Sequence, residues 1–128
     1  MSMQLRDPLA RARGRGPARS GVSHWWQQRV TAAALVILAV LLMACILSLM
    51  GASYETVRAT LGAPLPGVVV LLFVVAAFWH LRLGGQVVIE DYVHGEGVKM
   101  VAVVALTFAC CAVGLLCALA ELSLIIGA

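Results

Sequence analysis

Charged side chains are scarce in this sequence of 128 residues. Aspartate, glutamate, lysine and arginine together make up 12% of the chain, whereas 62% of it is hydrophobic. Soluble domains are on average about half apolar and about a quarter charged. A water-soluble fold of this length could not bury so much apolar surface, so the composition excludes a soluble enzyme domain. Lipid is therefore expected to be the solvent for most of the chain.

Cysteines are also few, and no internal repeat is visible. The four cysteines are Cys45, Cys110, Cys111 and Cys117. Their spacing matches neither a zinc site nor an iron–sulfur site. All four lie inside apolar runs, where a free cysteine behaves as a small packing residue. We interpret them as packing residues.

Three long apolar runs dominate the sequence instead. A helix that crosses a bilayer needs about 20 mostly apolar residues, because the hydrocarbon core is roughly 30 Å thick and a helix rises about 1.5 Å per residue. The runs cover about residues 30–50, 66–86 and 98–126. They are continuous rather than alternating, which excludes a closed β-barrel. The sequence predicts an all-α membrane protein with three transmembrane helices.

Positive charge gathers ahead of the first apolar run. Five of the nine basic residues fall within the first 19 residues, where only Asp7 opposes them. Such a bias retains the flanking segment in the cytoplasm. We therefore expect a flexible, cytoplasmic basic arm at residues 1–20, a three-helix anchor domain at residues 21–128, and a periplasmic C-terminus. Because Pro8 and Pro17 would break an amphipathic presequence helix, a bacterial inner-membrane protein is favoured over a mitochondrial one.

One histidine, His80, directly follows the apolar part of the second run. Ionisable groups at membrane depth are costly and usually mark a pathway or a cofactor, and neutral imidazole is a frequent haem ligand. Gly84, Val87 and Asp91 follow at offsets of four, seven and eleven, within about 40° of the same helix face. This stripe predicts a ligand with room beside it for a flat macrocycle or a partner helix. The alternative is a histidine hydrogen-bonded to a neighbouring helix, with Gly84 serving helix packing.

Further candidates lie near the expected cytoplasmic interface. Asp91 and Tyr92 come about three turns after His80, where a phenol can donate to a carbonyl oxygen and a carboxylate can exchange protons. They are alternatively a solvated acid and an interfacial anchor. Arg29 is placed to pair with the carboxylates of a cofactor, or to act as a positive-inside anchor. His24 is equally ambiguous.

A single deep histidine supplies only one axial ligand. A haem bound by two histidines needs a second one at the same depth on the other side of the ring. His24 and His94 lie near the expected membrane surface, so neither is well placed. We therefore expect the second ligand to come from another chain, which makes this chain one subunit of a complex.

Two segments carry a family resemblance: HWWQQRVTA at residues 24–32 and HLRLGGQVVIEDYVH at residues 80–94. They resemble the hydrophobic membrane anchor subunits of succinate dehydrogenase, the smaller cytochrome b anchors of respiratory complex II. The three-span layout and the length are similar along nearly the whole chain. Among the described motifs the second is the more specific, because histidine, glycine, glutamine and an Asp–Tyr pair occur in order.

The resemblance implies a non-catalytic subunit of an enzyme complex that reduces ubiquinone in the tricarboxylic acid cycle and respiratory electron transport. It implies that His80 is an axial ligand of a shared haem b, that Arg29 and His24 lie near the haem propionates, and that Tyr92, with Asp91 beside it, binds ubiquinone. The implied partners are a flavoprotein subunit, an iron–sulfur subunit and a larger cytochrome b anchor that supplies the other haem ligand.

Two other functions stay open from the residues alone. A small transporter protomer would need a polar face shared by more than one helix, whereas the first and third spans offer almost no intramembrane polar group besides Glu121. A cofactor-free structural anchor of another respiratory complex would need no haem ligand. The absorption spectrum of the purified complex separates these alternatives from a haem-bearing anchor.

Overall fold

The structure is a computed structural model that describes residues 18–127. Its regular elements are the helices α2 (Ala18–Ser48), α3 (Tyr54–Gly62), α4 (Pro64–Tyr92) and α5 (Glu96–Gly127). Three of them, α2, α4 and α5, are long and apolar enough to cross a membrane. The predicted all-α fold with three spans is therefore confirmed. Most of the predicted basic arm, residues 1–17, lies outside the described residues. Its last three residues, 18–20, form the beginning of α2.

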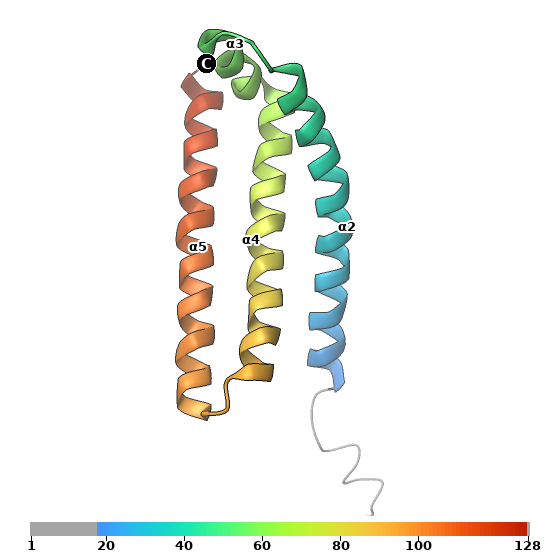
Figure 1. Ribbon diagram of the computed structural model, residues 1–128, viewed down its shortest axis with the longest axis vertical. Helices are drawn as coiled ribbons and strands as arrows, with labels where there is room; N and C mark the ends of the chain where they lie inside the picture. Colours follow the sequence, from blue (N-terminus) through green and yellow to red (C-terminus); the bar gives the residue numbers. More distant parts are fainter. Residues whose placement is uncertain (1–17, 128) are drawn as a thin grey trace, which may run out of the picture.

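The three long helices form one layer with α4 in the middle (Figure 1). Helix α4 packs against α2 on one side and α5 on the other, while α2 and α5 have no contact within residues 18–127. The start of α2 and the short connection at residues 93–95 lie at the same end of the layer, called here the turn end (Figure 1). Helix α3 crosses the opposite end, the α3 end. Side chains of α4 are consequently the ones that can reach both neighbours.

The segment between the first two spans, for which the sequence predicts no transmembrane helix, contains the short helix α3. Ser53 caps this helix, because its hydroxyl accepts a hydrogen bond from the backbone N–H of Thr56 at 3.3 Å. Gly51 has φ +80°, the left-handed conformation that the chain needs to turn out of α2. Pro64 then opens α4, where its missing N–H costs little. The nine residues of α3 mix polar and apolar side chains and include no long apolar run. A search of the sequence for long apolar runs therefore does not predict this helix.

Small residues let α4 and α5 approach closely. A Cβ atom added at Gly67 would lie 2.7 Å from Cδ1 of Ile125, and one added at Gly114 would lie 3.2 Å from Cγ of Phe78. A side chain at either position would therefore require the neighbouring side chain to move. Such packing of small residues is typical of helices in membranes, and here it brings α4 and α5 close together at two levels.

The chain buries few side chains of its own. Leu83 and Cys110 are the buried apolar side chains of the described part, whereas large apolar residues such as Ile37, Val40 and Phe108 are about half exposed or more. Apolar surface of this extent must be covered by lipid or by another protein. The fold is therefore that of a membrane-embedded chain, with α2 and α5 both presenting an outer face.

Candidate functional site

His80 lies half-buried in the seam between α4 and α2. Its Nδ1 atom is 2.9 Å from the Thr31 hydroxyl oxygen on α2. The Thr31 hydroxyl also reaches the backbone carbonyl of Gln27 at 2.8 Å, one turn back along its own helix. The contact expected under the alternative interpretation, a hydrogen bond from the histidine to a neighbouring helix, is therefore present. It occupies only one of the two ring nitrogens.

Polar contacts at the depth of His80 connect all three long helices. The indole N–H of Trp79 on α4 donates to the side-chain oxygen of Gln27 on α2 at 3.3 Å. On the other side, Arg82 donates from Nε to the Thr107 hydroxyl on α5 at 3.4 Å, and its guanidinium carbon lies 5.8 Å from the centre of the Trp79 ring. These bonds hold the segment around His80 between its two neighbours.

The adjacent glycines Gly84 and Gly85 differ in what surrounds them. A Cβ atom at Gly85 would lie 2.7 Å from Cδ2 of Leu106, so this glycine serves the packing of α4 against α5. A Cβ atom at Gly84 would meet only the side-chain nitrogen of Gln28, at 3.6 Å, which is ordinary contact distance. Within this chain, packing therefore explains Gly85 but not Gly84. Gly84 leaves room one turn from His80 on the side that faces α2.

The two residues expected near the propionates are not brought together. His24 precedes Thr31 by seven residues and so lies on the same face of α2, where its Nε2 atom is buried without a hydrogen-bond partner in residues 18–127. Arg29 is exposed and lies about 160° around α2 from Thr31. Its guanidinium carbon is 5.5 Å from the Trp25 ring centre. Only His24 shares the seam with His80.

Asp91 and Tyr92 form a separate pair at the turn end of α4. The helix continues without interruption to Tyr92, so the expected alignment of His80 and Asp91 on one face holds. Both residues of the pair are exposed, Tyr92 with 77% of its surface. Tyr92 lies about 18 Å from His80 along the helix axis. The predicted ligand and the predicted quinone residues therefore occupy two levels of one helix.

Sequence reasoning missed a polar hollow between α2 and α4 at the turn end. The hollow has a volume of about 490 Å³, and its polar lining comes from both helices: Ser23, His24, Gln27, Arg82, Gln86 and Glu90. Within it, the Gln86 amide donates to the Glu90 carboxylate at 2.7 Å. The four-residue spacing of Arg82, Gln86 and Glu90 would have revealed this second stripe of α4.

Thr31 was also missed as a partner of His80. It is a hydroxyl at the very start of an otherwise apolar run, seven residues after His24, and this spacing alone placed the two on one face. Which helix that face would meet depends on how the helices pack, and the sequence pattern does not report this. The hydrogen bond could therefore be found only in the folded chain.

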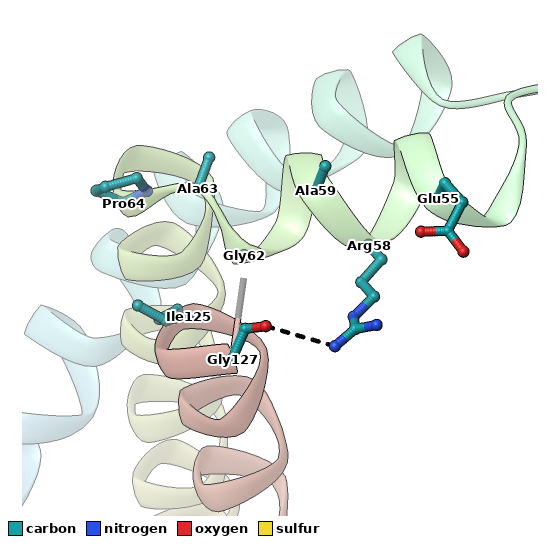
Figure 2. A pocket seen from close by; sticks show the side chains of 8 residues that line it. All are labelled: Glu55, Arg58, Ala59, Gly62, Ala63, Pro64, Ile125 and Gly127. Atoms are coloured by element: carbon teal, nitrogen blue, oxygen red, sulfur yellow. Dashed lines mark hydrogen bonds between the residues drawn. The ribbon is translucent and has the colours of Figure 1, made fainter.

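A second hollow, of about 620 Å³, lies at the α3 end (Figure 2). Arg58 of α3 extends toward the end of α5 and donates to the Gly127 carbonyl oxygen at 3.5 Å, while Glu55 lines the hollow from one turn earlier on α3. A basic side chain near the last carbonyls of a helix is a common cap. The hollow is at the opposite end of the layer from the start of α2 and the 93–95 connection, so it is separate from both groups of candidate residues.

The residues around His80 fit a haem iron approached from one side. Nδ1 is engaged by Thr31, which leaves Nε2 as the ring nitrogen for a metal, and Gly84 lies one turn further along the same face of α4 without a close contact. In residues 18–127 no three histidine, cysteine, aspartate or glutamate side chains gather into a metal-binding group. His80 would therefore offer one imidazole nitrogen to a metal, and a histidine is a common ligand of haem iron.

Comparison with known proteins identifies the family of this chain. Residues 3–114 match the family described as succinate dehydrogenase/fumarate reductase transmembrane subunit. The chain is 33% identical to the succinate dehydrogenase hydrophobic membrane anchor subunit of Paracoccus denitrificans, over 80% of this chain and 78% of that protein. It is 30% identical to the protein of the same name from Rickettsia bellii, over 82% of this chain and 84% of that one. No solved structure gives a significant match. The chain belongs to the succinate dehydrogenase/fumarate reductase transmembrane subunit family.

Proposed function

We propose that this chain anchors a succinate dehydrogenase in the membrane and contributes His80 as one axial ligand of a haem b. The second ligand comes from the larger cytochrome b anchor, and the soluble part of the complex consists of a flavoprotein and an iron–sulfur subunit. A bound haem b supplies a one-electron carrier inside the membrane. The chain itself holds and orients it.

The observation that carries this proposal is the surroundings of His80. A half-buried imidazole has one nitrogen tied to Thr31 across the helix seam, and a glycine without close neighbours lies one turn away. A purely structural histidine needs the hydrogen bond but not the open space at Gly84. Both features together suit a ligand that must present its second nitrogen to a large flat group.

Quinone binding is assigned to the turn end of α4. Tyr92 donates from its phenol to a quinone carbonyl, and Asp91 supports proton delivery nearby. Both side chains are exposed at the end of the helix, where a membrane-dissolved quinone can meet a soluble electron donor and water. The turn end then faces the cytoplasm of a bacterium and the α3 end faces the periplasm, in agreement with the basic residues that precede α2.

The absorption spectrum of the purified complex tests this function. The complex is expected to oxidise succinate with a quinone as acceptor and to show a b-type Soret band, and this chain expressed alone should lack the band because it holds half of the ligand set. If the complex is active without any b-type band, this chain is a cofactor-free anchor. A band retained by the isolated chain would contradict the shared site.

A further inference from the structure

We propose that Thr31 is a positioning residue for the haem: its hydroxyl oxygen accepts the Nδ1 proton of His80 and thereby fixes the tautomer whose Nε2 binds iron. This inference rests on the proposed function, since it concerns how the ligand is prepared. It goes beyond that function because it assigns a role to a residue of a different helix, one that touches His80 and not the iron.

The hydrogen bonds of Thr31 determine the direction of its contact with His80. A threonine hydroxyl has one proton and two lone pairs. The Thr31 oxygen lies 2.8 Å from the Gln27 carbonyl oxygen and 3.2 Å from the Gln28 carbonyl oxygen, and these carbonyls can only accept. The single hydroxyl proton is therefore used along α2, the usual bond of a threonine inside a helix. The lone pairs remain for the contact with His80.

The tautomer of His80 follows from this arrangement. Because Thr31 acts as acceptor at 2.9 Å, Nδ1 of His80 must carry the ring proton. In a neutral imidazole the other nitrogen, Nε2, then has its lone pair free. The opposite tautomer would place a proton on Nε2 and prevent it from binding a metal. The Thr31 contact therefore selects the form of His80 that can act as a ligand.

The location of Thr31 also fixes the orientation of the His80 ring. Thr31 belongs to the middle of a continuous helix, and the residue next to His80, Trp79, is bonded to Gln27 of the same helix. The ring is thus held by a fixed acceptor rather than by a mobile loop. Ring nitrogens of metal-binding histidines commonly donate to such an acceptor, which orients the ring and increases the basicity of the ligand.

Increased basicity has a measurable consequence. A ring that donates from Nδ1 gives more electron density to Nε2, which favours ferric over ferrous iron and lowers the midpoint potential of the haem. Removal of the acceptor should shift the potential upward and weaken retention of the haem. A contact that merely ties α2 to α4 would change the stability of the complex without moving the potential.

The test is a redox titration of the haem in purified membrane complexes, together with the low-spin electron paramagnetic resonance signal. Thr31→Val removes the acceptor and keeps the shape, whereas Thr31→Ser keeps the hydroxyl. Thr107→Val is the matched control, because Thr107 also donates to a carbonyl one turn back and accepts a bond from the next helix, in this case from Arg82. Thr31→Ala replaces the valine variant if that one does not assemble.

We expect an upward shift of the potential and an altered resonance signal in Thr31→Val, with Thr31→Ser and Thr107→Val close to wild type. A wild-type potential in an assembled Thr31→Val or Thr31→Ala complex would overturn the inference, as would an equal shift in Thr31→Ser. A wild-type complex without a b-type haem would instead refute the proposed function, so the two failures are distinguishable.

Discussion

Trp79 donates its indole N–H to the side-chain oxygen of Gln27 at 3.3 Å, so the residue directly before His80 is fastened to the helix that also carries Thr31. Two hydrogen bonds from neighbouring residues of α4 thus reach α2 within one helical turn of each other. The first fixes the backbone segment and the second fixes the imidazole. The orientation of His80 depends on this pair of contacts.

The Trp79–Gln27 bond can be removed separately. Trp79→Phe keeps an aromatic ring but loses the donor, at a cost of about 0.5–1.5 kcal/mol, the net value of a typical hydrogen bond. We expect the haem to be lost at a lower temperature than in wild type, with an unchanged spectrum before the loss. Thermal scans of the Soret band provide the measurement. A normal melting profile would show that the bond does not hold the seam together.

Gly84 and Gly85 offer a matched pair of substitutions. Gly85→Ala requires the end of the Leu106 side chain to move, so it should destabilise the α4–α5 contact by about 1 kcal/mol, the low end of overpacking costs, while the haem spectrum stays intact. Gly84→Ala meets only ordinary contact distances within the chain, so the fold should tolerate it, but the added methyl group fills the space beside His80. We therefore expect Gly84→Ala to change the haem spectrum. Identical behaviour of the two variants in spectrum and thermal stability would contradict the distinction.

The three spans and the place of His80 on the second span could be predicted from the sequence, because both depend only on the order of apolar and polar residues along the chain. The stripe of His80, Gly84 and Asp91 was also predictable, since α4 is one uninterrupted helix. The contact to Thr31 was not, because it depends on which faces of two helices meet. The sequence-based prediction did not include that His24 and Arg29 lie on different faces of α2. It considered only how deep each residue lies in the membrane and not its position around the helix.

Tyr92 can be tested by removing only its hydroxyl. Tyr92→Phe deletes one donor worth about 0.5–1.5 kcal/mol, so quinone reduction should fall several-fold. Succinate oxidation with an artificial soluble acceptor should remain, because that route bypasses the membrane. Both activities are measured on the same preparation. An equal loss of both would indicate failed assembly, and undiminished quinone reduction would leave Tyr92 as an interfacial anchor.

The orientation in the membrane is predicted from the basic residues that precede α2 and from the odd number of spans. Alkaline phosphatase fused after Ala128 should be active, since it folds only in the periplasm, and green fluorescent protein at the same point should be dark. Fusions placed in the 93–95 connection should give the opposite pattern. The reverse result at both positions would show that the chain has the opposite orientation, with Tyr92 on the periplasmic side.

The central claim is that His80 binds the haem, and the optical spectrum of the assembled His80→Ala complex tests it most directly. His94→Ala is the control, because His94 is exposed in the connection between α4 and α5. We expect the low-spin b-type spectrum to be lost or strongly perturbed in His80→Ala and to be unchanged in His94→Ala. An unaltered b-type spectrum in an assembled His80→Ala complex would contradict the assignment.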